Sequence, residues 1–161
     1  MRRIVTIAAA LLVLGIANFT IAAREAVLAG GRVVLLDLAP VDPRSIMQGD
    51  YMALRFRIEA QAFGSDRGAH PAEGVMIAKI DADNVANFRR FDDGTPLAAD
   101  EVRLRYRWRD GAAKLGTNAF FFEEGRGKDY AGAKYGEARV GENGEVVLTG
   151  LRGANREPLG P

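Results

Sequence analysis

The chain has 161 residues and a mass of 17.4 kDa, which is room for one domain and an anchor. Its 22 basic and 21 acidic residues give a net charge of +1, and this near-neutral balance argues against a nucleic-acid partner. Because the chain has no cysteine, disulfides, thiolate metal sites and cysteine-based catalysis are excluded. Serine occurs only at Ser45 and Ser65 and histidine only at His70, so few residues suit nucleophilic catalysis.

The N-terminal segment is apolar from Ile4 to Ala23, and Arg2 and Arg3 precede it. A helix of this length, at about 1.5 Å per residue, covers roughly 30 Å, the hydrocarbon thickness of a bilayer. The two arginines predict that the N-terminus stays in the cytoplasm and that the domain lies outside. We expect a single-pass anchor over residues 1–24 in the inner (cytoplasmic) membrane. A cleaved signal peptide is the alternative, because small alanines end the segment.

The following residues, 25–153, have the pattern of a β-rich extracytoplasmic domain. Apolar residues and arginines alternate most regularly over residues 101–109, which predicts a strand with one buried face. Further strands are predicted at residues 32–38, 75–80, 115–123, 137–140 and 145–151, with a short apolar segment at 85–91 and a short helix at 128–134. Asp110-Gly111 and Asn143-Gly144 are signals for hairpin turns. We expect a mainly β sandwich or open barrel of about seven strands with one short helix, ended by a polar, frayed tail at 154–161.

Residues 42–56 combine a proline turn, a glycine hinge and the start of a strand. Pro43 fixes its own φ and favours a turn, and Gly49 can adopt a positive φ that reverses the chain. From Tyr51 to Glu59, apolar and charged residues then alternate, as in a strand with one buried face.

Gly49-Asp50-Tyr51, followed by Leu54 and Phe56, resembles the signature of the GDYXXLXY family, with Phe56 in place of the final tyrosine. The lead-in at residues 41–45 and a second block at 121–127 are also similar to that family. Its members are mostly uncharacterised membrane-anchored proteins, so the resemblance implies a membrane-associated protein and no known reaction. The residues expected to form a binding site are Asp42, Arg44, Gly49, Asp50, Tyr51, Leu54, Phe56, Glu124, Gly125 and Gly127.

The motif also has a purely structural interpretation. Asp50 can cap the turn at Gly49, and Tyr51 can belong to the core with its hydroxyl satisfied. The second block has no P-loop sequence, and a turn into the following helix is its expected role. Asp81 and Asp83 lack the spacing of an EF-hand, and we predict neither a metal site nor a cofactor.

Four arginines share one face of the strand predicted at residues 101–109. They are Arg103, Arg105, Arg107 and Arg109. An anionic partner, either lipid headgroups or an acidic protein surface, would explain this stripe. The alternative is a solvated face whose charges are offset by carboxylates on neighbouring strands.

For function, the leading expectation is a non-enzymatic, membrane-anchored periplasmic domain that binds a polytopic membrane protein. The rival is a serine-lysine hydrolase that resembles signal peptidases in part, with Ser45 as nucleophile and Lys79 as a buried base. A third hypothesis is a cell-wall or carbohydrate-binding module, which needs an exposed aromatic pair such as Tyr106 and Trp108. The alternation instead predicts that these two rings lie in the core.

Overall fold

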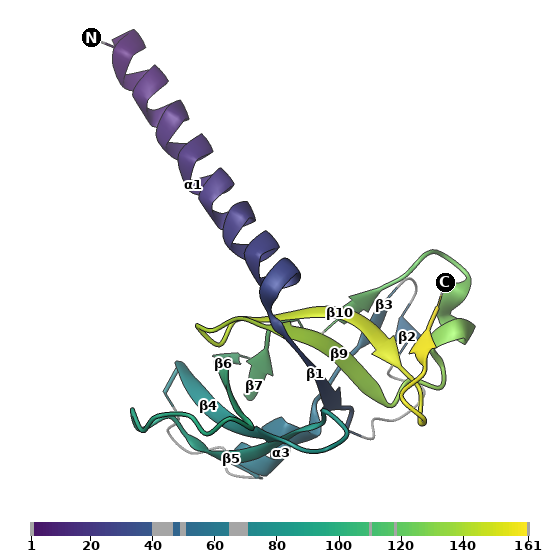
Figure 1. Ribbon diagram of the computed structural model, residues 1–161. Coiled ribbons are helices and arrows are strands. Elements are labelled where there is room, and N and C mark those ends of the chain that lie inside the picture. Colours follow the sequence, from purple (N-terminus) through teal and green to yellow (C-terminus); the bar gives the residue numbers. More distant parts are fainter. Residues whose placement is uncertain are drawn as a thin grey trace.

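The computed structural model describes residues 2–39, 47–48, 51–64, 71–109, 111–117 and 119–160. Helix α1 (Arg2–Gly30) projects from the body and ends at the glycine pair, as the sequence predicts (Figure 1). It is long and apolar enough to cross a membrane, and no part of its most apolar stretch is buried against the rest of the chain. The body from which it projects consists mostly of strands.

Two four-stranded antiparallel sheets and a smaller three-stranded sheet form the body. The first sheet has the order β1 (Arg32–Asp37), β9 (Tyr135–Val140), β10 (Val146–Arg152), β11 (Pro158–Leu159). The second has the order β5 (Ala86–Phe91), β4 (Glu73–Ile80), β6 (Glu101–Arg109), β7 (Ala112–Leu115). The smaller sheet has the order β2 (Met47–Gln48), β3 (Tyr51–Ala53), β8 (Ala119–Phe121).

The two larger sheets are curled, and backbone hydrogen bonds connect them at two places. Leu35 N–H donates to the carbonyl of Asn84 at 2.8 Å, which brings β1 beside the start of β5. Arg105 N–H donates to the carbonyl of Gly144 at 2.7 Å, which ties β6 to the turn between β9 and β10. The architecture is therefore mainly β and close to an open barrel, as predicted, and seven strands of the described chain have four or more residues.

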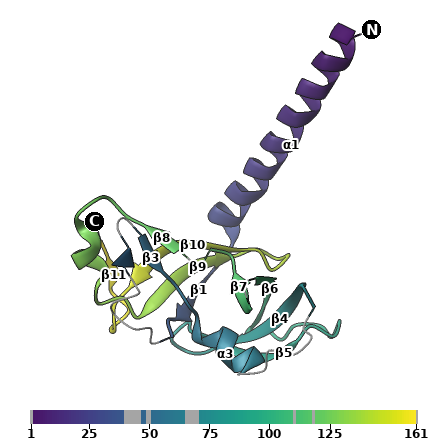
Figure 2. The ribbon, with the colours of Figure 1, turned by 180° about the vertical axis from the view of Figure 1, so that it is seen from behind.

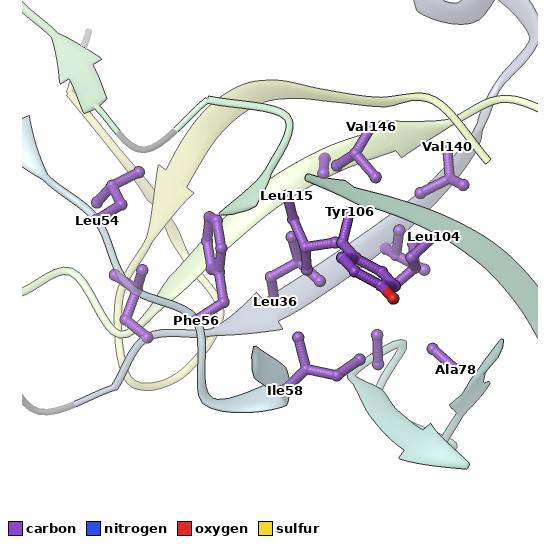
Figure 3. Packing of buried hydrophobic residues seen from close by; sticks show 14 of the residues in the cluster. Leu36, Leu54, Phe56, Ile58, Ala78, Leu104, Tyr106, Leu115, Val140 and Val146 are labelled. Carbon is purple, nitrogen blue, oxygen red and sulfur yellow. The ribbon is translucent and has the colours of Figure 1, made fainter. Parts of the chain in front are cut away.

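The core lies between the inner faces of these sheets (Figure 3). Leu36 from β1 in the first sheet and Leu104 and Leu115 from β6 and β7 in the second are almost fully buried and gather in this core. Val140 and Val146 extend the core to the end of the body where α1 ends. Burial of apolar surface from both sheets is the main source of stability in such a fold.

The strand predicted from Tyr51 to Glu59 is wrong in its second half. β3 ends at Ala53, the chain stays extended through Phe56, and α3 (Arg57–Phe63) follows. Its sequence suits a helix because glutamate, alanine and glutamine are good helix formers, and Ile58 and Phe63 are both buried. α3 packs against β5, β1 and β7, so the same apolar residues that suggested a strand cover the core as a helix.

The single strand predicted at 115–123 is divided between two sheets. Gly116 separates β7 from β8 with a φ of +60°, and a Cβ at this position would lie 2.5 Å from the carbonyl oxygen of Val146. Such a conformation and such a close approach both favour glycine. The hairpins predicted at residues 110–111 and 143–144 are confirmed, since β6 pairs with β7 and β9 pairs with β10.

Two predictions about the C-terminal third also differ from the structure. The short helix is a 3₁₀ turn at Arg126–Tyr130, earlier than the predicted residues 128–134. The tail is not frayed at its end, because Leu159 pairs with Leu151 in β10. Gly160 lies against the ring of Tyr130, which ties the end of the chain to that 3₁₀ turn.

Candidate functional site

The residues of the first motif divide between the core and the surface. Leu54 and Phe56 are 3% and 2% exposed, so they stabilise the fold and are not available to a partner. Tyr51 begins β3 and is half-buried. Among the described residues of the motif pattern, Tyr51 is therefore partly exposed on the short sheet, while Leu54 and Phe56 are buried.

The two sequence blocks that carry the family resemblance meet in space. β3 pairs with β8 so that Tyr51 stands opposite Phe121, and their ring centroids are 5.8 Å apart. Phe121 is 72% exposed, the largest exposure among the large apolar residues of the described body outside α1. An exposed aromatic ring that adjoins further apolar surface is a feature of sites that contact a partner.

A shallow hollow of about 410 Å³ continues from this pair of rings. It is lined by Phe121, Phe122, Glu123, Arg126 and Tyr130. Arg126 Nε donates to Asp129 at 2.9 Å, and this hydrogen bond raises the pKa of the guanidinium above its ordinary value. We call Tyr51 and the residues that line this hollow the motif patch.

The second block forms the turn that the sequence predicts. Arg126 N–H donates to the carbonyl of Glu123 at 3.1 Å, and Gly125 has a φ of +81° at the start of the 3₁₀ turn. Glu124 is exposed and Gly127 is partly exposed. Glu124, Gly125 and Gly127 therefore form the turn that positions Arg126. They do not themselves line the hollow of the motif patch.

Several predicted site residues lie outside the described residues. They are Asp42, Arg44, Ser45, Gly49 and Asp50. Met47 and Tyr51 stand next to them in the chain, and β2 pairs with β3 there. The predicted role of those five residues thus stays a prediction.

The arginine stripe on β6 is partly compensated. Arg103 Nε donates to Asp92 at 3.2 Å, and the pKa of Asp92 is lowered first by the N–H of Gly94 and then by this arginine. Arg107 lies 3.9 Å from Glu73. Arg105 and Arg109, by contrast, have no ion-pair partner within 4 Å in the described part of the chain. Offsetting by neighbouring carboxylates explains two of the four charges.

The structure does not provide the buried lysine that a serine-lysine hydrolase needs or the exposed aromatic pair that a carbohydrate-binding module needs. Lys79 is 59% exposed and pairs with Asp100 at 3.4 Å, so it is not the buried base of a serine-lysine hydrolase. Tyr106 is 3% exposed, and Trp108 packs edge-on against Phe63 at 5.2 Å, so the two rings do not form an exposed pair for sugars. Over the described ranges, no three His, Asp or Glu side chains are grouped to hold a metal ion.

Glu59 on α3 is a buried carboxyl group that the sequence pattern did not single out. Its Oε2 accepts the N–H of Phe56 at 3.4 Å, while its Oε1 is buried with no hydrogen-bond partner among the described residues. Burial raises the pKa of Glu59 to about 7, and the backbone N–H groups of Phe56 and Leu115, followed by the charges of Lys114 and Arg55, offset only part of this effect. The group is therefore poised between its neutral and charged forms near neutral pH.

Sequence reasoning also missed the exposure of Phe121, although a signal for it was present. Residues 120–122 are three consecutive phenylalanines, and successive side chains of a strand point to opposite faces. Phe120 and Phe122 pack toward the core and contact Tyr130, so the ring between them must face outward. Three aromatic residues in a row therefore predict one exposed ring.

Comparison with known proteins identifies the family of the chain. A family model described as GDYXXLXY protein matches residues 13–151, which is most of the chain. No curated protein and no solved structure matches the chain. The match includes residues 13–30 of α1, both motif blocks, the strands from β1 to β9 and all of β10 except its last residue. The chain therefore belongs to the GDYXXLXY family.

Proposed function

We propose that this protein is a membrane-anchored accessory domain that acts by contact, on the extracytoplasmic side, with a polytopic membrane protein. The observation that carries the proposal is the motif patch, where the two family motif blocks meet and leave Phe121 72% exposed. Large aromatic residues together with arginine are the side chains that most often dominate the energy of protein interfaces. Tyr51, Phe121 and Arg126 are such a set.

The anchor supports the choice of a membrane partner. α1 presents its most apolar stretch entirely uncovered, which suits contact with lipid. Tethering confines the patch to a thin layer above the bilayer and raises its effective concentration toward proteins in the same membrane. A weak patch of a few side chains is then enough for a specific contact.

Retention of the anchor is the first testable consequence. An epitope tag placed at the N-terminus of the full chain is expected to stay with the domain in membranes washed with alkaline carbonate, because no cleavage separates them. Protease added outside the cytoplasmic membrane should digest the domain and spare the tag. Loss of the tag from the mature chain would mean that the segment is a cleaved signal peptide.

Contact through the motif patch is tested by site-specific photocrosslinking in native membranes. A photoreactive phenylalanine analogue at Phe121 is expected to give a discrete adduct with another membrane protein. The same analogue at Val33, an exposed apolar residue on β1 at 39% exposure, should give none. The change Tyr51→Lys, made together with the Phe121 probe, is expected to reduce the adduct at least about tenfold, since it places an unpaired charge in the contact. Equal adducts from both positions, or none from Phe121, would count against the proposal.

A further inference from the structure

A second hollow lies at the foot of α1, on the outward face of β6 and apart from the motif patch. It has a volume of about 760 Å³. α1 contributes Thr20, Ala23 and Arg24 to its wall, and β6 and β7 contribute Arg105, Arg107, Arg109 and Lys114. Figures 1 and 2 show the lower end of α1 above β9 and β10, with β6 and β7 close by from both sides.

The wall of this hollow concentrates positive charge. It holds five basic side chains and one carboxylate, that of Glu145, which lies 3.8 Å from Arg24. Arg105 and Arg109 have no ion-pair partner within 4 Å in the part of the chain that the structure describes. The whole chain has a net charge of only +1, so these arginines are segregated here and are not part of a generally basic surface.

The position of the hollow along α1 matches the headgroup layer of a bilayer. Arg24 is the first charged residue after the apolar run that ends at Ala23, and a helix crossing a membrane leaves the hydrocarbon at such a boundary. From Arg24 to Gly30 the helix rises about 9 Å over seven residues, close to the thickness of one headgroup layer. The outward face of β6 therefore lies within reach of lipid phosphates.

The lining also has an apolar part. Ala23 on α1 and Val147 and Leu148 on β10 border the same hollow as the arginines. A phospholipid has the matching arrangement, with a charged phosphate next to a glycerol backbone and acyl chains. A soluble acidic protein would match the charges but would have to enter the narrow layer between the body and the membrane.

We propose that this hollow binds the phosphate group of an anionic phospholipid in the leaflet beside the domain. Arg105 and Arg109 donate paired hydrogen bonds to the phosphate oxygens, for which the planar guanidinium is well shaped. Arg24 and Lys114 add charge from the other walls, and the lipid fixes the orientation of the body on the membrane. This inference depends on the proposed membrane anchor and does not depend on the motif patch.

The test uses the full chain purified in a mild detergent, with lipids added at known ratios and bound lipid counted by native mass spectrometry. The probes are dioleoyl phosphatidylglycerol and dioleoyl phosphatidylcholine. The wild type is expected to retain phosphatidylglycerol about tenfold more than phosphatidylcholine, and the double variant Arg105→Gln, Arg109→Gln to lose this preference. The matched control Arg89→Gln, Lys134→Gln removes two exposed charges away from the hollow and should keep the preference.

Each other outcome contradicts the proposal. Equal retention of both lipids by the wild type, or equal loss in the control variant, would mean that the hollow is not a lipid site. Binding of inorganic phosphate alone at the same strength would identify a phosphate site without a lipid. Thermal unfolding of both variants checks that they are folded. Carbonate extraction distinguishes the two proposals. If α1 is not an anchor, every variant is released from membranes, and if only the lipid site is wrong, every variant stays integrated.

Discussion

Replacing Phe56 with alanine is expected to lower the free energy of unfolding by about 4 kcal/mol, the usual cost of deleting a buried aromatic ring. Phe56 is 2% exposed, and its ring lies so close to Gly136 that a Cβ there would be 3.0 Å from Cε1 (Figure 3). Neighbours on β9 and β10 are fixed by sheet pairing and cannot collapse into the space. Urea unfolding of the full chain in detergent, followed by the fluorescence of the single tryptophan, Trp108, measures the effect.

The matched control for this prediction is Phe121→Ala. The same ring is removed, but from a position that is 72% exposed, so the stability should change by less than about 1 kcal/mol. The two phenylalanines thus separate the parts of the family pattern that stabilise the fold from the part that is free to bind. If the two substitutions cost the same, the distinction between core and patch drawn from the structure is wrong.

Replacing Glu59 with glutamine is expected to stabilise the protein by about 3 kcal/mol at pH 8 and to change little at pH 4. Burial raises the pKa of Glu59 to about 7 in the folded chain from an ordinary value of 4.5. Between these values the folded state binds more protons than the unfolded state, so the stability contributed by the neutral carboxyl group is full below pH 4.5. It is lost as the pH rises through 7, because the buried group must then ionise.

Urea unfolding of the wild type and the Glu59→Gln variant at several pH values between 4 and 8 checks this prediction. Glutamine keeps an oxygen to accept the N–H of Phe56, so the start of α3 is retained. Glu123→Gln is the control, since its side chain is 84% exposed and should leave the pH dependence unchanged. A constant difference between the wild type and Glu59→Gln across this range would show that Glu59 ionises at the same pH in the folded and unfolded chains.

The elements predicted correctly are those with strong local signals. The alternation over residues 101–109 fixes β6 as a strand with Val102, Leu104 and Tyr106 buried. Asn143-Gly144 fixes a hairpin because Gly144, with a φ of +81°, adopts the left-handed conformation that the turn requires. Such signals act over a few residues, so no distant contact is needed to read them.

The main wrong prediction is the strand over residues 57–59, where the structure has helix α3. Two local patterns coincide there. Alternating apolar residues place Met52, Leu54, Phe56 and Ile58 toward the core, and all four are buried. Burial at Ile58 is equally compatible with a strand and with the first turn of a helix. A contact far along the chain distinguishes the two: as part of a helix, Phe63 reaches the rings of Tyr106 and Trp108 on β6.

The amino-acid sequence by itself determined the apolar N-terminal helix, the β-rich body and its family, because length, hydrophobicity and period are local properties of the chain. Tertiary structure alone decided that Tyr51 meets Phe121 and that Arg24 shares a hollow with Arg105 and Arg109. The alternation of side chains along a strand shows which residues share a face, but it does not show which faces pack together. That depends on the pairing of strands far apart in the chain, which the packing of the whole core selects.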